Sequence, residues 1–439
     1  MKKFIQTIKN IYKIEELRKR IVYTFLLILV YRLGSFIVLP GIDPSVIAEF
    51  SASMSNRTDA LSLLNMFSGG AFGNVSIFAL GVMPYISASI VVQLLGVFVG
   101  KFRKMQAEES GRRKLNQITR LLTIVILCIQ GPAYISNIMH QYPNAFLVSS
   151  KLYILAATVI LLGGSMFVMW LGESITERGI GNGISLIIMI GIIARLPQAF
   201  MAEVLSKAGS TTGGILLLIV EFVILFFVFV AAIALVQAVR KVPVQYANRV
   251  IGNKQYGGVR QYIPLKVNAS GVMPIIFAQA IMLFPIIFSR FDATRGFAAA
   301  MSNYTGLWYN LVFGFLVIVF TYFYTAVTFQ PNMMAEDMKK NGGFIPGVKP
   351  GKKTMEYLDT IMTRIVLPGS IFLAIIAVLP AIATLCGVNN QFASFYGGTS
   401  LLILVGVVLD TLQQVESHLL MRHYDGLMKT GRLTGRSGM

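Results

Sequence analysis

The stretch that decides the fold is LSLLNMFSGGAFGN at 61–74, followed by VSIFALGVMPYISASIVVQ at 75–93. The second string is apolar enough for a membrane-spanning helix, whereas the first carries glycine, serine and asparagine, which break helices. A helix-breaking backbone exposed to lipid would leave its polar groups unsatisfied, at a cost of several kcal/mol each. We therefore expect the first string to face a water-filled cavity.

Apolar runs like the second string recur through the chain of 439 residues, which is 55% hydrophobic and only 13% charged. This composition is typical of an integral membrane protein, and a run of about 18 apolar residues can cross the bilayer as a helix. The fifth run is the weakest, because the GIGNG that opens it signals a loop. The predicted fold is an all-α polytopic membrane protein with ten spans: 20–39, 76–98, 115–139, 150–172, 182–200, 213–238, 270–289, 307–328, 364–385 and 396–417.

Basic residues alternate between the loops that join these spans. The loop at 40–60 holds only Arg57, whereas Lys and Arg concentrate in the N-terminal tail, the loops near 100–120, 239–267 and 330–362, and the tail after 418. Because cytoplasmic loops retain basic residues, both termini are predicted to lie in the cytoplasm. Much of the net charge of +19 then forms a cytoplasmic surface suited to anionic lipid, RNA or an acidic partner, although topology control alone could also explain it.

The sequence shows no sign of an enzyme or a metal site. The residues His140, His418 and His423 lack metal-ligand spacing, and there is no P-loop or Ser-His-Asp set. Cys128 and Cys386 lie far apart in or beside spans and are interpreted as buried thiols. The first apolar run is too long for a signal peptide and has no small-residue cleavage site after it. We therefore expect no catalytic activity, no cofactor and a retained N-terminus.

Two short strings occur twice, in the same order. GVMPYI at 81–86 returns as GVMPII at 271–276, and GISLII at 183–188 returns as GTSLLI at 398–403. Both pairs are five predicted spans apart, and an odd offset places the copies in opposite orientation across the membrane. The repeat predicts two inverted five-helix halves.

The predicted halves comprise residues 1–200 and 201–439, and in such folds the functional site lies at the midplane where the halves meet. Each repeated string ends in isoleucine, and two aliphatic residues of the first half lie one helical turn earlier. Without the repeat, such residues would be interpreted as core or lipid-facing. Six side chains could thus converge on one axis: Val82, Ile86, Ile184, Ile188, Ile276 and Ile403.

Polar residues inside spans are costly and therefore informative. The clearest ionisable ones, Arg32, Glu221 and Asp410, are scattered over different spans, which disfavours a proton- or sodium-coupled transporter. The neutral ones can bond weakly across helices, which suits an interface that opens. These neutral residues are Ser87, Ser89, Gln93, Gln130, Asn268 and Gln279.

Several long strings resemble the SecY family, the channel subunits of the bacterial protein-export translocon. They are MFSGGAFGNVSIFALGVMPYISASIVVQLL at 66–95, WLGESITERGIGNGISLIIM at 170–189, PLKVNASGVMPIIFA at 264–278, NMMAEDMKKNGGFIPGVKPGKKT at 332–354 and YGGTSLLI at 396–403. The resemblance runs along the whole chain. It implies an hourglass channel in the plasma membrane that conducts unfolded secretory polypeptides and releases signal sequences and membrane segments sideways into lipid.

By this resemblance, the six aliphatic positions form a ring that closes the waist of the pore. A dry ring blocks ions when empty and seals loosely around any passing chain, and the smaller Val82 should be tolerated. A short plug helix, 61–67, would close the pore from outside, with 68–74 as its flexible tether and Phe67 and Phe72 packing beneath the ring. The implied plug and hinge residues are Leu64, Phe67, Ser68, Gly69, Gly70, Phe72, Gly73 and Asn74. The gate helix that follows is expected to start near Val75.

The resemblance also implies a lateral gate between the second and seventh spans. Its residues are Ser87, Ile90, Gln93, Asn268, Ile281 and Phe284. The glycine and proline of each GVMP string, Gly81 with Pro84 and Gly271 with Pro274, interrupt the gate helices and could act as hinges or as static kinks.

The loops at 239–267 and 330–362 are expected to dock a motor or a ribosome. The first alternates apolar and polar residues around a Gly-Asn turn and predicts a protruding β-hairpin; in the second, a short helix should end at Asn341 before a basic tip. The implied docking residues are Arg240, Lys241, Arg249, Lys254, Arg260, Lys349, Lys352 and Lys353. Many relatives carry arginine at Lys349, so bidentate hydrogen bonding is lost there. The implied partners are SecE, SecG, the SecA motor ATPase, the ribosome, signal peptides with unfolded precursors, and anionic lipids.

Two other classes remain open from the residues alone. A secondary transporter also uses inverted repeats and broken helices, but it would show a cluster of ionisable residues at the midplane. A structural membrane scaffold would have a packed interior with neither funnel nor plug.

Overall fold

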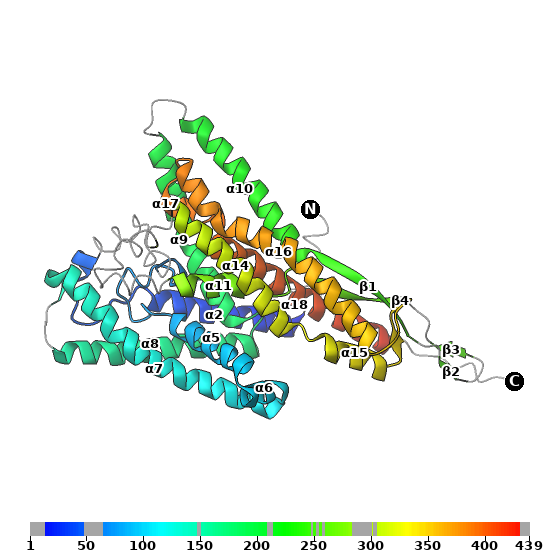
Figure 1. The fold of residues 1–439 in the computed structure, drawn as a ribbon. Helices are drawn as coiled ribbons and strands as arrows, with labels where there is room; N and C mark the ends of the chain where they lie inside the picture. Colours follow the sequence, from blue (N-terminus) through cyan, green and yellow to red (C-terminus); the bar gives the residue numbers. More distant parts are fainter. Residues whose placement is uncertain are drawn as a thin grey trace. The chain divides into compact units, whose positions relative to one another are not determined.

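The chain folds almost entirely into helices, with a small amount of β-structure, in the computed structural model (Figure 1). The structure describes residues 14–47, 65–146, 151–208, 214–246, 249–251, 254–256, 260–282, 301 and 305–430. It divides into two compact units, and each is considered by itself. The first holds the described residues up to Arg195 together with those from Val407 onward; the second holds those of Leu196–Gly406. The inverted halves, 1–200 and 201–439, stay a prediction.

Most helices of the first unit are long and apolar. The helices are α2 (Glu15–Gly34), α5 (Met83–Phe98), α6 (Gly100–Ala107), α7 (Glu109–Gln141), α8 (Lys151–Arg178) and the first part of α9 (Gly183–Ala208). A single 3-10 turn, η1 (Pro143–Ala145), follows α7.

The second unit combines helices with strands. Its helices are α10 (Gly214–Gln237), α11 (Met273–Met282), α14 (Leu307–Thr328), α15 (Pro331–Lys340), α16 (Lys352–Leu385), α17 (Asn390–Ala393) and the first part of α18 (Gly398–Thr430). Its strands are β1 (Val239–Tyr246), β2 (Arg249–Ile251), β3 (Lys254–Tyr256), β4 (Arg260–Lys266) and β5 (Gly343–Phe344).

Seven helices of the described chain are long and apolar enough to cross a membrane. The predicted fifth span, expected to be the weakest, is one of them: α9 runs for 26 residues beyond the GIGNG turn. Each of the ten predicted spans overlaps a described helix, and part of the seventh, 283–289, lies outside the described residues. The chain is a multi-pass helical membrane protein.

Several helices extend well beyond their predicted spans. Helix α16 begins at Lys352, so the end of the predicted loop 330–362 is helical, and α18 continues to Thr430. The extensions carry charged residues, such as Lys352 and Lys353 on α16. Hydropathy predicts only the apolar part of a helix that lies in the hydrocarbon core. The helix itself continues until a residue that breaks its backbone hydrogen bonding.

The gate helix was expected to start near Val75, and this expectation is wrong. Helix α5 begins at Met83. The residues from 68 to 82 form turns, and Val75 itself has a positive φ of 45°. The glycine-proline pairs therefore lie at helix starts rather than inside helices. Gly81 and Gly271 have φ values of 51° and 63°, which favour glycine, and each proline follows within the first helical turn, where its missing N–H costs nothing.

The two basic loops share one sheet, which the sequence did not predict. The hairpin itself is confirmed: β1 pairs antiparallel with β4, and β2 with β3 nearer its tip (Figure 1). Strand β5 from the second loop pairs with the other edge of β1, through Gln245 with Phe344 and Tyr246 with Gly343, giving the order β4-β1-β5. A hydrophobic cluster beneath this sheet joins Val242 and Val244 to Leu358 of α16. The predicted helix end at Asn341 is also confirmed, because Asn341 caps α15.

The cysteine interpretation was wrong. Cys128 and Cys386 are both free and exposed on the surface of the chain. Cys128 lies on α7, and an apolar run does not reveal which of its faces is packed against another helix.

Candidate functional site

All four repeated strings begin helices. GVMP starts α5 and α11, and each glycine of GISLII and GTSLLI is the first residue of its helix, α9 or α18. Ile86 and Ile276 are each the fourth residue of their helices, and Ile188 and Ile403 are each the sixth. The repeat therefore marks equivalent positions within the first two turns of four helices.

The second unit brings two of the predicted ring helices together. The Gln279 side-chain N–H donates to the Thr399 hydroxyl at 3.2 Å, which joins α11 to α18. A Cβ on Gly406 of α18 would lie 3.8 Å from Val272, next to the start of α11. Ile276 and Ile403 thus lie on neighbouring helices, half-buried and buried respectively.

The first unit carries the other four ring residues. Val82 and Ile188 are buried, and Ile86 and Ile184 are half-buried. Ile184 lies against Gly172 of α8, where a Cβ would come within 2.8 Å of the isoleucine side chain. None of the four is strongly exposed, as a dry constriction requires.

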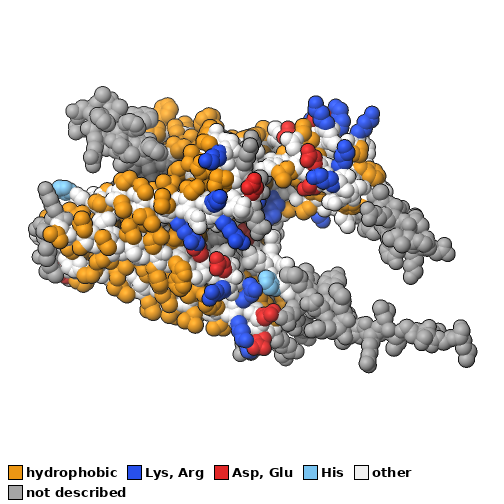
Figure 2. Space-filling model, turned by 90° about the horizontal axis from the view of Figure 1, so that it is seen from below, with side chains coloured by type: hydrophobic (Ala, Val, Ile, Leu, Met, Phe, Trp, Pro, Cys, Tyr) orange, Lys and Arg blue, Asp and Glu red, His pale blue; other side chains and the backbone are white. Residues whose placement is uncertain are grey.

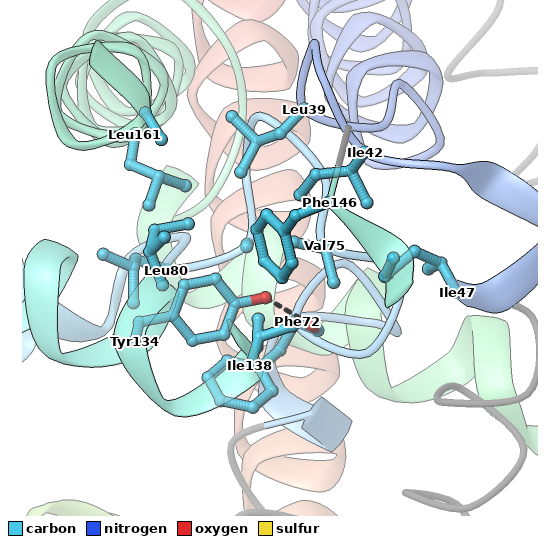
Figure 3. Packing of buried hydrophobic residues seen from close by; sticks show 14 of the residues in the cluster. Leu39, Ile42, Ile47, Phe72, Val75, Leu80, Tyr134, Ile138, Phe146 and Leu161 are labelled. Atoms are coloured by element: carbon cyan, nitrogen blue, oxygen red, sulfur yellow. Dashed lines mark hydrogen bonds between the residues drawn. The ribbon is translucent and has the colours of Figure 1, made fainter. Parts of the chain in front are cut away.

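The predicted tether is held by hydrogen bonds to three neighbouring side chains. The Tyr31 hydroxyl donates to the Ser68 carbonyl at 3.2 Å, and the Arg32 guanidinium to the Gly69 carbonyl at 3.1 Å. The Tyr134 hydroxyl donates to the Phe72 carbonyl at 2.6 Å, with the two rings 4.7 Å apart (Figure 3).

Further contacts within the segment complete this arrangement. The Gly73 N–H donates to the Asn65 side chain at 2.8 Å, and the Phe72 N–H to the Ser68 hydroxyl at 3.0 Å. Gly69 packs directly on the backbone of Gly191 in α9, where a Cβ would lie 2.7 Å from the Gly191 Cα.

The tether is therefore an ordered, hydrogen-bonded turn rather than a loose linker. Gly69 and Gly70 have φ values of 64° and 94°, so their role here is to form the turn. Gly73 has no positive φ and Asn74 is half-buried. Phe67 is half-buried and helical, like Asn65 and Met66 before it. Leu64 and the rest of the predicted plug helix lie outside the described residues.

Phe72 belongs to a hydrophobic cluster of the first unit. The cluster includes Leu39, Ile42, Ile138 and Leu161, and Figure 3 shows Phe72 lying beside Tyr134 and Ile138 within it. The placement of Phe72 beneath the ring stays a prediction.

The predicted gate residues form two groups, one in each unit. Gln93 donates to Ser89 at 3.3 Å along its own helix, and its side-chain oxygen accepts no hydrogen bond from the described residues. Asn268 is 8% exposed and accepts from the Ser270 hydroxyl at 3.3 Å. Of the remaining members, Ser87 is half-buried, Ile90 is buried, Ile281 is exposed and Phe284 lies outside the described residues.

The docking residues lie on the sheet and on the start of α16. Arg240, Lys241, Lys349, Lys352 and Lys353 are all exposed. In Figure 2 blue Lys and Arg side chains gather away from the broad orange hydrophobic surface. The Lys353 ammonium also contacts the Glu356 carboxylate at 3.0 Å, so its charge is partly compensated. The backbones of Arg249, Lys254 and Arg260 lie in strands, and their side chains are outside the described part.

Comparison with known proteins places the chain among protein translocase channels. A family model, SecY, matches residues 76–412. The protein translocase subunit SecY of Chlamydia trachomatis is 39% identical over 98% of this chain and 99% of its own length, and that of Halalkalibacterium halodurans is 41% identical over 97% and 100%. Two solved structures cover 95% of this chain and 95% of theirs: a protein-conducting channel, with a TM-score of 0.58 at 17% identity, and a SecY protein whose plug domain stabilises the closed translocation channel, with a TM-score of 0.60 at 18% identity.

Proposed function

The chain belongs to the SecY family, and we propose on that premise how its residues perform the work of a protein-conducting channel. It is the channel subunit of a protein translocase, conducting unfolded polypeptides across the membrane and releasing apolar segments into the bilayer. The observation that carries this function is the family match, which spans both copies of each repeated string. The secondary-transporter alternative is not supported, because the relatives are translocase subunits over almost their whole length. The family is a channel family rather than an enzyme family.

We propose that the six aliphatic residues form the closed waist of the pore. Support comes from their equivalent positions at the starts of α5, α9, α11 and α18, and from the fact that three of the six are buried and the other three half-buried. A ring of charges or fixed donors would hold some passing segments too tightly, whereas branched aliphatic groups exclude ions without binding any sequence.

The turn at 65–76 is proposed as the seat of the plug. Three carbonyl groups of this turn accept hydrogen bonds from the side chains of Tyr31, Arg32 and Tyr134. These contacts would fix the position of the plug. Plug opening then requires these hydrogen bonds to break or the helices that carry them to move.

The three-stranded sheet and the start of α16 are proposed as one docking platform. Because β5 pairs with β1, a partner that engages one basic loop also engages the other. The proposed partners of this platform are the SecA motor and the ribosome. SecE and SecG are proposed as further subunits that hold the outside of the two halves. Signal peptides and unfolded precursors are the proposed cargo, and anionic lipids are proposed to lie around the basic surface. The proposed location is the bacterial plasma membrane with both termini in the cytoplasm.

The test of the function is reconstitution in lipid vesicles with a purified motor ATPase and a signal-bearing precursor. We expect ATP-dependent protection of the precursor from added protease. Absence of protection with every plausible motor would reject the channel function.

The test of the ring uses ion leak from the same vesicles without precursor. Replacing Ile86 and Ile276 with glycine should increase the leak of the closed channel, because the constriction becomes wider and wetter. Replacing Ile219 with glycine is the control, because this isoleucine is exposed on α10 and has no place in the ring or the gate, and it should leave the closed channel tight. An unchanged leak in the ring variants would reject the ring assignment.

A further inference from the structure

A buried ionic cluster lies in the second unit, where α9 ends and α10 begins. The Lys207 ammonium is 3.0 Å from the Glu221 carboxylate and 3.8 Å from that of Glu203. Glu203 is 1% exposed and Glu221 is 4% exposed. The sequence placed Glu221 among scattered ionisable residues; the fold instead brings it together with a second acid and a base.

The cluster holds two carboxyl groups and one ammonium group. Apart from these ion pairs with Lys207, Glu203 Oε1 and both oxygens of Glu221 accept no hydrogen bond from the described residues. Both carboxyl groups face the same Lys207 ammonium, at 3.0 Å and 3.8 Å, so one positive charge faces two acids. Two carboxylates around one ammonium repel each other, whereas a protonated carboxyl group carries no charge. An additional buried negative charge is costly, so a shared proton is the arrangement that neutralises the cluster.

The same residues hold the segment that leads into α18. The Asn389 N–H donates to Glu203 Oε2 at 2.8 Å, and the Lys207 ammonium donates to the Gly387 carbonyl at 3.0 Å. The Tyr396 hydroxyl donates to the backbone carbonyl of Glu221 at 2.9 Å.

Aromatic packing supports these contacts. Phe222 of α10 lies 5.6 Å from Phe200 of α9 and 5.8 Å from Phe392 of α17, and Phe392 lies 5.7 Å from Tyr396 (ring centroids). Gly398 then begins α18, which carries the ring residue Ile403.

We propose that Glu203 and Glu221 share one proton and that this proton-holding cluster positions the start of α18, and with it Ile403. The positioning part rests on the proposed function of the ring. When the shared proton passes to solvent, two carboxylates face one ammonium, their repulsion weakens the contacts to 387–396, and the closed channel becomes leakier. The groups that face the pair from the packed elements are Lys207 on α9 and Tyr396 before α18.

The proton is tested by infrared difference spectroscopy of the reconstituted protein during a pH step. We expect a carbonyl band of a protonated carboxyl group that disappears in Glu203→Gln and also in Glu221→Gln, because the remaining carboxyl then pairs with Lys207 as a carboxylate. Glu173→Gln is the matched control: it removes a carboxylate that is paired with Arg120 at 2.7 Å in the first unit and should leave the band unchanged. A band that survives in both cluster variants, or no such band in the unaltered chain, overturns the shared proton.

Positioning is tested by ion leak across the same pH range. The unaltered channel should leak several-fold more above the pH at which the infrared band disappears than below it, and Glu221→Gln, which imitates the protonated state, should remove this dependence. Glu173→Gln should keep it. If Glu221→Gln does not fold, Glu203→Gln provides the same comparison. A pH profile that is identical in the unaltered chain and in a folded cluster variant overturns the positioning role, and this outcome is independent of whether precursor transport succeeds.

Discussion

Tyr134 shows how one side chain can hold the segment proposed to seat the plug. Its hydroxyl reaches the Phe72 carbonyl at 2.6 Å, and both residues are buried in the same hydrophobic cluster. A buried carbonyl that loses its donor keeps the cost of being withdrawn from water, about 1–3 kcal/mol. This contact therefore contributes more to the order of the turn than its single hydrogen bond suggests.

The variant Tyr134→Phe should loosen the turn at 65–76 without emptying the cluster, because the ring is kept. We expect a higher ion leak from vesicles that contain the closed channel. Tyr153→Phe is the control, since it removes a 3.0 Å bond to the Pro40 carbonyl at an exposed site. Equal leak in the two variants would contradict the role assigned to Tyr134.

The starts of helices, more than their lengths, organise the proposed pore. Four helices begin at repeated strings, and in α5 and α11 a glycine in the left-handed region directly precedes the helix. That geometry turns the chain sharply and sets where the first aliphatic side chain points. A residue with a Cβ is strained in this region by about 1–2 kcal/mol.

The variant Gly271→Ala should lower the stability of the chain by about 1–2 kcal/mol. No atom lies within 4 Å of a Cβ built at Gly271, so the effect would come from the backbone alone. Gly163→Ala in α8 is the matched control, because it has equal space but an ordinary helical backbone, and it should be neutral or slightly stabilising. Thermal unfolding in detergent, followed by circular dichroism, measures both; a neutral Gly271→Ala would show that the turn does not need glycine.

The sheet β4-β1-β5 joins two loops that are far apart in sequence. Val244 is 1% exposed in the cluster beneath it, whereas its neighbour Pro243 is exposed on the same strand. A buried polar side chain without a partner would destabilise this platform by about 1–3 kcal/mol.

The variant Val244→Asn should weaken motor binding severalfold while leaving the ion leak of the empty channel unchanged. Pro243→Asn places the same side chain on the exposed face and should bind the motor normally. Binding of the purified motor to reconstituted vesicles distinguishes them. A loss of binding in both variants would assign the effect to the exposed surface rather than to the core of the platform.

At the scale of the whole molecule, the net charge of +19 produces the longest-range interactions with other molecules. Exposed charges act over about 10 Å at 0.1 M salt, and over about 3 Å at 1 M. A basic docking surface should therefore attract its partners in a manner that depends strongly on salt.

Raising the salt concentration should reduce motor binding and precursor transport together, while the ion leak of the closed channel, which depends on apolar packing, stays constant. Measurement of all three across a salt series checks this expectation. Transport that is insensitive to salt would contradict electrostatic docking.

The variant Lys349→Arg offers a further comparison, because it restores bidentate hydrogen bonding at the tip of the second loop.

The membrane fold and the channel function could be predicted from the sequence, and the details of the site only in part. Apolar runs identify membrane helices because their signal is summed over many residues, and the repeated strings indicated the proposed ring positions, which the structure places near the starts of four helices. The start of α5 was misplaced by eight residues, from Val75 to Met83, because an apolar turn and an apolar helix have the same composition. The hydrogen bond between Tyr134 and Phe72 joins residues that are 62 positions apart, so no local sequence pattern predicts it.

The sequence by itself determined the membrane class, the repeated strings, the basic loops and the family, since each of these depends on composition, period or long matching strings. Only the tertiary structure decided what holds the turn at 65–76, that the two basic loops share a sheet, and that Glu203, Lys207 and Glu221 meet. These features depend on contacts between residues far apart in the chain. Such contacts form only when the packing of helices places polar groups where water cannot reach them, so that each must find its partner within the protein.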